Sequence, residues 1–245
     1  MQDRTGTTRR MWEIYKKGGI TPAFASMLGS SNAHQMAFIR SAMKVQRQKS
    51  LFEMPLASLE AVVFDLETTG FNPHNGDEIL SFGAAAVVGN QLVEDEQFYS
   101  LSNPGKPVSE EITSLTGITT EMASDAPELI EALHRFFEFV QKRILVAHAA
   151  GHDKPFLNAA LWKTSKVSLT HRVLDTMMIA KWLHPSLAAY DLDALLNLYD
   201  IPIEGRHHAL KDSIMTAKLW VRMVERILDR NVTTVGDLYM YLSKH

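Results

Sequence analysis

Asp65 and Glu67 follow a short apolar run, residues 61–64, and are spaced so that they can act together. Alternate residues of a β-strand point to the same face, so both carboxylates would project from one side of a strand. Two such carboxylates repel each other unless a cation lies between them. Because only oxygen ligands are offered, a hard cation such as Mg²⁺ or Mn²⁺ is favoured. An acidic turn at the end of a strand explains the pair equally well, so the pair alone leaves both interpretations open.

Two more carboxylates and a histidine favour the metal site. Asp153 begins a predicted helix directly after a predicted strand, and Asp212 lies in the first turn of the predicted helix 209–229. His207 precedes Asp212 by five positions and therefore lies just outside that helix. A neutral imidazole can accept a proton from a metal-bound water. The combination predicts a centre for metal-dependent hydrolysis.

The other histidines give weaker signals. His148 and His152 are four residues apart beside Asp153, a spacing that suits a transition-metal pair on a helix. His148 ends a predicted strand and Gly151 intervenes, so a shared helical face is not expected. The His152-Asp153 dipeptide also resembles the HD-type phosphohydrolases, but those proteins are all-helical and this chain has clear strand signals. The remaining histidines have no partners in the sequence and are interpreted as surface or packing residues: His34, His74, His134, His171, His184 and His245.

The order of predicted elements indicates how these side chains are positioned. Apolar, β-branched runs predict three consecutive strands, with Gly89-Asn90 as the hairpin turn between the second and third. Their ranges are 61–64, 78–88 and 91–101, and further strands are predicted at 143–148 and 172–175. Helical patterns cover 109–117, 126–141, 153–162, 176–183, 191–199 and 209–229. Three strands followed by alternating strands and helices predict an α/β fold, with a mixed sheet flanked by helices.

The N-terminal region differs from the rest in charge. Residues 1–55 hold nine Lys/Arg and three Asp/Glu, a balance of +6, whereas the remainder has a balance of −9. A short helix is predicted up to Gly18-Gly19, a connector over 20–32, and a helix over 33–48 with a basic stripe. The stripe comprises Arg40, Lys44 and Arg47. Such a region suits binding to an anionic polymer, and it equally suits a solvated surface helix.

Composition excludes several classes of protein. The 245 residues are 46% hydrophobic and 22% charged, with a net charge of −3, which is ordinary for a globular protein. The chain has no cysteine, so disulfide frameworks, thiolate zinc sites, iron–sulfur clusters and cysteine nucleophiles are excluded. No apolar run approaches the ~18 residues of a membrane span, and the N-terminus lacks a signal-type apolar stretch. We therefore expect a soluble cytoplasmic protein without a membrane partner.

Five segments then occur in a familiar order: DLETTG (65–70), LTGIT (115–119), LVAHAAGHD (145–153), LDTMMIAKWL (174–183) and HHALKDSIMTA (207–217). Together they resemble the DEDDh 3′→5′ exonucleases, the ribonuclease H-like (DnaQ-like) family of the proofreading epsilon subunit of bacterial DNA polymerase III. The resemblance covers about residues 60–225. It implies a ribonuclease H-like mixed sheet and two ions of Mg²⁺ or Mn²⁺. It also implies hydrolysis of single-stranded 3′ ends of DNA to nucleoside 5′-monophosphates, in replication proofreading or repair.

The resemblance also implies roles for individual residues. It implies four metal ligands, Asp65, Glu67, Asp153 and Asp212, with His207 as the general base. Substrate-binding positions implied by the same motifs are Leu66, Thr68 and His148. This chain departs from the family in having Ala149 where Asn is frequent, His152 where an apolar aromatic is frequent, and His208 where Arg is common. The first two departures concern nucleotide placement and rate.

Alternatives of substrate and activity stay open. The same chemistry can act on RNA, as in related RNA-trimming exonucleases, because spacing does not show whether a 2′-hydroxyl is accepted. A catalytically silent nucleic-acid-binding module of the same fold is a further alternative, against which the complete acidic set with His207 argues.

The boundaries and a partner motif complete the interpretation. We expect a basic, mainly helical extension and linker (1–55), an exonuclease domain (56–230) and a C-terminal tail with a short helix (231–245). Gln48, Leu51 and Phe52 in QKSLF resemble the bacterial sliding-clamp-binding peptide, in which Gln hydrogen-bonds and an apolar pair fills a pocket. A clamp and a DNA polymerase subunit are thus expected partners. In the alternative interpretation, Leu51 and Phe52 anchor the linker to the core.

Overall fold

Five strands of the described residues form one mixed sheet in the order β3-β2-β1-β4-β5. The computed structural model describes residues 22–45 and 49–243, with side chains described for 31–44 and 51–243. The antiparallel strands are β1 (Glu60–Thr68), β2 (Ile79–Val88) and β3 (Gln91–Leu101), and the strands parallel to β1 are β4 (Ile144–Ala147) and β5 (Val173–Asp175). This arrangement confirms the predicted α/β fold with a ribonuclease H-like mixed sheet.

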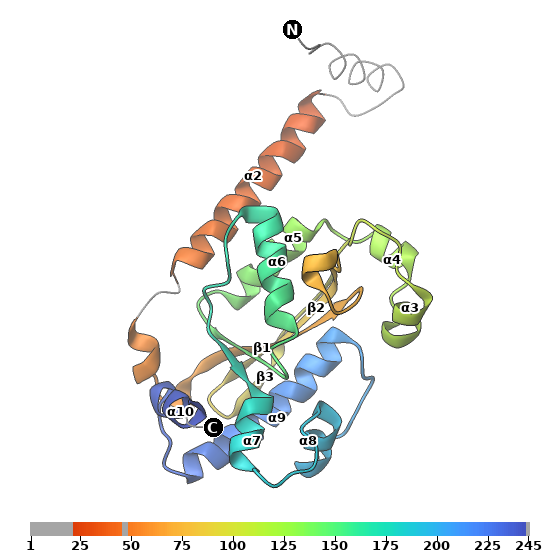
Figure 1. Cartoon of the computed structure of the whole chain (residues 1–245). Helices are drawn as coiled ribbons and strands as arrows, with labels where there is room; N and C mark the ends of the chain where they lie inside the picture. Colours follow the sequence, from red (N-terminus) through yellow and green to blue (C-terminus); the bar gives the residue numbers. More distant parts are fainter. Residues whose placement is uncertain (1–21, 46–48, 244–245) are drawn as a thin grey trace.

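Helices cover both faces of the sheet (Figure 1). Their bounds are α2 Pro22–Val45, α3 Glu110–Thr116, α4 Thr120–Ser124, α5 Leu129–Val140, α6 Asp153–Ser165, α7 Thr176–Leu183, α8 Leu192–Leu198, α9 Ala209–Asp229 and α10 Val235–Leu242. Short 3₁₀ turns lie at η1 Lys49–Glu53, η2 Leu56–Ser58 and η3 Pro73–Asn75. The 3₁₀ turns and α4 were not anticipated, because one-turn segments have too few residues to show a period.

The alternation of side chains along β1 divides the core in two. Val62, Phe64 and Leu66 pack with α2, α5 and α6 on one face of the sheet. Ala61 and Val63 pack with α7, α8 and α9 on the other face. Since both faces are covered, the strand reads as a continuous apolar run rather than an alternating one. The positions that follow Ala61 and Val63 on the α9 face are Asp65 and Glu67.

The strand that carries the acidic pair is longer than expected. We predicted a strand over 61–64 with the acids after its end, whereas β1 continues through Thr68. Its antiparallel pairing with β2 continues beyond the apolar run, with Asp65 opposite Gly83 and a register shift after Glu67. Its parallel pairing with β4 covers only residues 61–63. The acidic half of β1 therefore extends past β4, which leaves room there for the first turn of α6.

The predicted connector over 20–32 is wrong, because α2 begins at Pro22 and continues to Val45. Proline is tolerated at the first helical position, where its missing N–H would have no acceptor. The residues that follow it, AFASML, are mostly good helix formers. Ile39 and Met43 are buried against the body of the protein. Three predicted features lie outside the described residues: the helix before Gly18-Gly19, Arg47 of the basic stripe, and the end of the second helix at residue 48.

The residues around the two predicted boundaries of the exonuclease domain are joined to each other. The N–H of Leu56 donates to the carbonyl of Thr233 at 2.8 Å, and that of Val235 donates to the carbonyl of Met54 at 3.0 Å. Helix α10 follows, with Thr234 as its N-cap. The boundaries at residues 55 and 230 stay predictions. Over the residues that the structure describes, no helix is both long and apolar enough to cross a bilayer.

Candidate active site

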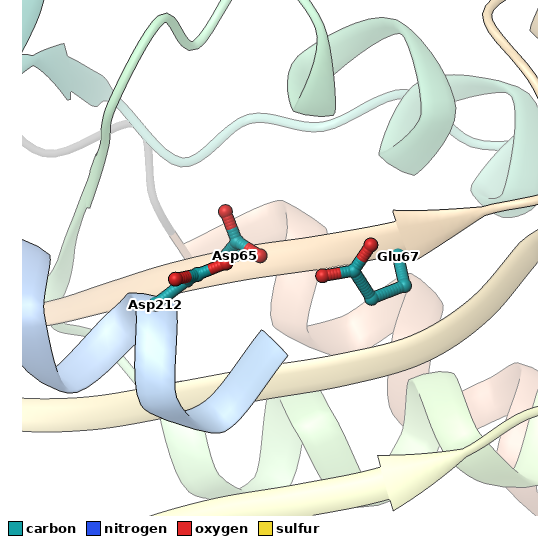
Figure 2. A group of neighbouring side chains, drawn as sticks. All are labelled: Asp65, Glu67 and Asp212. Carbon is teal, nitrogen blue, oxygen red and sulfur yellow. The ribbon is translucent and has the colours of Figure 1, made fainter. Parts of the chain in front are cut away.

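Three carboxylates converge where the C-terminal half of the central strand β1 meets the first turn of α9. Asp65 and Glu67 project from β1, and Asp212 comes from the first turn of α9 (Figure 2). One oxygen from each of the three lies within 4.8 Å of the other two. This set offers only oxygen ligands, which fits a hard divalent cation such as Mg²⁺ or Mn²⁺.

Asp153 and His207 belong to the same cavity. The cavity measures about 370 Å³, and its lining includes Asp65, Glu67, Asp153, His207 and Asp212. Asp153 lies outside the triplet, at the start of α6. Its charge nevertheless helps to raise the pKa of Asp65. All five predicted catalytic residues, from β1, α6 and the start of α9, are therefore brought together.

Burial makes these carboxylates hold protons strongly. Burial raises the pKa of Glu67 to about 8, with contributions from the charges of Asp212 and Asp153. Burial also raises the pKa of Asp153 to about 7. The pKa of Asp65 is well above its usual range because of lost hydration and the charges of Asp153, Glu67 and Asp212. The cluster is unfavourable as bare anions and favourable with protons or a cation.

These pKa shifts predict how stability depends on pH. Between about pH 5 and pH 8, folded Glu67 and Asp153 keep protons that the unfolded chain has already released. Where the folded state binds more protons than the unfolded state, the free energy of unfolding falls as the pH rises. We therefore expect the Tm in EDTA to decrease as the pH rises through this interval, and the gain in Tm on adding Mg²⁺ to increase. Thermal unfolding at pH 5, 6, 7 and 8 measures both, and Glu67→Gln should flatten the slope. A Tm in EDTA that rises with pH would contradict this prediction.

Gly83 lets the first turn of α9 reach β1. It lies on β2 opposite Asp65, and a Cβ atom at this position would lie 2.0 Å from the backbone carbon of Ala209. No side chain fits there without moving α9, which carries Asp212. Sequence reasoning missed this residue, and its signal was a glycine inside an apolar strand, which marks a close backbone approach.

We expect Gly83→Ala to displace the start of α9 and separate Asp212 from Asp65. A misplacement of about 1 Å at a reacting centre costs about 100-fold in rate, so a loss of about that size is expected in nuclease turnover. Gly151→Ala is the matched control, because a Cβ atom at that position would meet nothing within 4 Å and the φ of Gly151 is ordinary. Equal turnover of Gly83→Ala and wild type would show that α9 is not held by this contact.

Asp175 holds the loop that leads into α6. Its carboxylate accepts hydrogen bonds from the N–H groups of Ala149 at 3.1 Å and Ala150 at 3.0 Å. It also caps α7 by accepting from the N–H of Met177 at 2.8 Å. One side chain thus fixes the end of β5, the start of α7 and the approach to Asp153. Sequence reasoning did not single out Asp175, although an Asp directly before a helix is an N-cap signal.

Ala149 adopts a left-handed conformation, with φ of 53°. This conformation costs an ordinary L-residue about 1–2 kcal/mol, and Asn tolerates it better. The family's frequent Asn at this position therefore has a backbone reason that the sequence comparison alone does not reveal.

We expect Ala149→Asn to stabilise the protein by about 1 kcal/mol through relief of this strain. A change of that size raises the Tm of a chain of this length by about 2–4 °C. Ala149→Val is the matched control and should lower the Tm, since a β-branched residue fits this conformation least well. An unchanged or lower Tm in Ala149→Asn would contradict the argument.

The two histidines of this loop have different partners and do not act as a pair. Nδ1 of His148 lies 3.0 Å from Oγ1 of Thr176, and burial lowers the pKa of His148. Burial also lowers the pKa of His152, whose ring packs near Phe71 and Phe156 with centroid distances of 5.8 and 5.0 Å. Both histidines are therefore favoured in their neutral form and line the cavity.

The predicted substrate-binding residues lie along the same cavity. Leu66, Thr68 and His148 all line it. Oγ1 of Thr68 donates to the carbonyl of Gly70 at 2.7 Å and lies 3.5 Å from Nε2 of His152. These contacts connect the end of β1 to the loop before α6.

His207 and His208 face different surroundings. His207 lines the cavity with φ of 61°, and its N–H donates to Oδ2 of Asp212 at 2.8 Å. His208 does not line the cavity and stacks on Tyr99 with ring centroids 4.7 Å apart. The backbone therefore directs only the first of the two toward the carboxylates, as the predicted register requires.

Arg206 is a site residue that sequence reasoning missed. Its Nη1 lies 2.5 Å from Oδ1 of Asp212, and its Nε donates to Oδ1 of Asp193 at 2.6 Å. Its charge lowers the pKa values of Asp65 and Glu67 against the larger effects that raise them. The only signal was a basic residue directly before His207.

The predicted clamp-binding residues lie away from this cavity. Gln48 is outside the described residues, and Leu51 packs against the core on the α9 side of the sheet. Phe52 is 40% exposed. Its ring lies 4.2 Å from the guanidinium carbon of Arg172 and 5.7 Å from the ring of Tyr239. Both residues therefore already have partners within the chain.

Sequence relatives share most of this chain. It is 36% identical over 200 residues to the DNA polymerase III subunit epsilon-like protein of Rhodobacter capsulatus, covering 81% of this chain and 28% of the relative. It is 37% identical over 186 residues to the PolC-type DNA polymerase III of Caldanaerobacter subterraneus subsp. tengcongensis, covering 74% of this chain and 13% of the relative. The chain thus spans less than a third of the length of either relative.

Solved structures share the fold. The nuclease domain of 3′hExo, a DEDDh family member bound to rAMP, superposes with a TM-score of 0.62 at 20% identity and covers 69% of this chain and 92% of that one. Exonuclease X in complex with 5′ overhanging duplex DNA superposes with a TM-score of 0.55 at 21% identity. The match covers 67% of this chain and 91% of that one.

The chain also matches a known protein family over the region that holds the five motifs. Residues 62–220 match the family described as Exonuclease. This range contains all the carboxylates of the cavity, His207 and the five motifs. The resemblance drawn from the motifs is confirmed, and the chain belongs to the exonuclease family.

Proposed function

We propose that this chain hydrolyses the terminal phosphodiester of a single-stranded 3′ end of DNA and releases nucleoside 5′-monophosphates. The observation that carries the proposal is the convergence of Asp65, Glu67, Asp153, Asp212 and His207 in one cavity. A purely structural acidic cluster would not need a histidine directed into it from a left-handed backbone position. The relatives named for DNA polymerase III support a role in replication proofreading or repair.

The acidic residues would hold two divalent cations, Mg²⁺ or Mn²⁺, with Asp65 shared between them and the other three carboxylates completing the ligand set. Cations bound there would supply neutralisation of the substrate phosphate, an activated water and stabilisation of the leaving 3′ oxygen. Without them, the carboxylates would repel a phosphodiester. His207 would accept the proton of the attacking water. The N–H of His207 orients the Asp212 carboxylate, which is one of the proposed ligands.

The apolar part of the cavity lining suits a nucleobase. Phe71, which is 79% exposed, and the partly exposed Ile112 and Leu115 line the cavity beside the carboxylates. An exposed aromatic ring and aliphatic side chains can stack on any base without reading its identity. A terminal nucleotide would thus place its base on this wall and its phosphate at the carboxylates. Such a wall supports activity that is independent of sequence.

RNA is the second candidate substrate, because structural neighbours include a 3′-exonuclease that recognises the histone mRNA stem-loop. Matched DNA and RNA oligonucleotides with free or blocked 3′ ends distinguish the substrates. Release of 5′-monophosphates from free DNA ends, dependent on Mg²⁺ or Mn²⁺, is the expected result. Preferential release from RNA would make the chain an exoribonuclease. Binding without any release would make it a silent nucleic-acid-binding module.

Sliding-clamp binding through Gln48, Leu51 and Phe52, beside a polymerase subunit, is a separate proposal. The exposure of Phe52 favours it, whereas the packing of Leu51 favours the anchor interpretation. Leu51→Ala/Phe52→Ala distinguishes them. Loss of clamp binding with an unchanged Tm and full nuclease activity on a short oligonucleotide supports the clamp proposal. A Tm several degrees lower identifies the two residues as core anchors.

A further inference from the structure

We propose that Arg206 is a built-in competitor of the divalent cation at Asp212, and that Asp193 holds its guanidinium when the cation takes this carboxylate. The inference rests on the proposed metal site. It assigns Arg206 a role in setting metal affinity, which neither the motifs nor the comparisons give it.

Among the described residues, Oδ1 of Asp212 has an ionic partner but no aligned hydrogen bond, whereas Oδ2 has a hydrogen-bond donor. Oδ1 lies 2.5 Å from Nη1 of Arg206, and Oδ2 accepts the N–H of His207 at 2.8 Å. The Asp212 side chain is buried, with 3% exposed. A cation held by Asp65, Glu67 and Asp212 together must therefore share this carboxylate with the guanidinium or displace the guanidinium from it.

The positive charge of Arg206 allows it to compete with a cation for these carboxylates. Of the described residues that line the cavity, it is the sole Lys or Arg, facing Asp65, Glu67, Asp153 and Asp212. A guanidinium stays charged at every relevant pH, so it cannot yield its place by losing a proton. It yields only by moving away or by sharing the carboxylate.

Asp193 offers the place to which it can move. This residue lies in the first turn of α8, and its side chain is half exposed. Nε of Arg206 donates to Oδ1 of Asp193 at 2.6 Å, while a different nitrogen contacts Asp212. Because the guanidinium presents several donors in a rigid fork, it can lose one contact and keep the other. Asp193 thereby lowers the cost of freeing Asp212.

A double-mutant cycle measured by calorimetric titration of Mn²⁺ into the full chain, without DNA, tests this mechanism. We expect Arg206→Gln to bind Mn²⁺ about tenfold more tightly, as the loss of one charged contact predicts. Asp193→Asn should bind it more weakly, because the displaced guanidinium loses its partner. The decisive variant is the double one, in which Asp193→Asn should have no further effect. Arg222→Gln is the control, since Arg222 forms an exposed pair with Glu225 on the same helix.

Additive effects of the two substitutions on Mn²⁺ affinity would mean that both residues act only as distant charges, which would overturn the inference. Equal Mn²⁺ affinities of Arg206→Gln and wild type would overturn it as well. Without cation, Arg206→Gln should have a lower Tm, because Asp212 is left buried without its ionic partner. Arg206→Lys keeps the positive charge but lacks the separate guanidinium nitrogens that contact Asp193 and Asp212. The effect of Asp193→Asn should vanish in that background too, and its persistence there would also overturn the inference. Coupled affinities in a chain that cuts no 3′ end would contradict only the proposed function.

Discussion

Asp65→Ala is expected to reduce nuclease turnover by about 10³-fold or more while leaving the fold intact. Asp65 is the proposed shared ligand of both cations, and losing charge stabilisation of several kcal/mol corresponds to a loss of that size. The same change removes one of several mutually repelling carboxylates, whose charges and burial raise the pKa of Asp65 well above its usual range. The Tm in EDTA should therefore hold or rise, while the gain in Tm on adding Mg²⁺ should shrink.

Release of 5′-monophosphates from a DNA oligonucleotide, measured beside thermal unfolding, checks both parts. Asp95→Ala is the matched control, because Asp95 lies on the exposed strand β3 and has no part in the cavity. Near-wild-type turnover in Asp65→Ala would remove the two-cation mechanism. Low turnover with a collapsed Tm would instead make Asp65 a structural residue.

His207→Ala is expected to slow turnover by about 10²–10⁴-fold, the range for loss of a general base. Its backbone N–H still donates to Asp212 after the change, so the carboxylate keeps this partner. Affinity for Mn²⁺ should therefore change little, which separates a proton acceptor from a ligand. Single-turnover assays with calorimetric titration of the same variant measure the two effects.

The neighbouring histidine supplies the control for this experiment. His208 stacks on Tyr99 outside the cavity, so His208→Ala should keep most of the turnover. If His208→Ala were the impaired variant and His207→Ala the normal one, the assignment of the general base would be wrong. A large loss of Mn²⁺ affinity in His207→Ala would make that histidine a ligand.

The sequence alone determined the elements whose pattern is local. Runs of apolar residues and the Gly89-Asn90 turn predicted the hairpin of β2 and β3 close to its observed bounds. Ser109 and Gly117 marked both ends of α3, because an N-cap side chain and a left-handed glycine act on the backbone next to them. The acids and His207 were found from their types and spacing, and the family resemblance of the surrounding segments implied their roles.

Tertiary structure decided whatever depends on contacts between distant segments. The first part of α2 combines good helix formers with turn signals such as Gly29 and Ser30, and it is helical within a helix whose later residues, Ile39 and Met43, pack on the body. Packing of this kind outweighs weak local propensities. Gly83 inside an apolar strand signals a close backbone approach, but only the tertiary structure shows that the start of α9 makes this approach. The ion pairs of Arg206 bring α8 and the start of α9 together at one guanidinium, and no local period encodes such a contact.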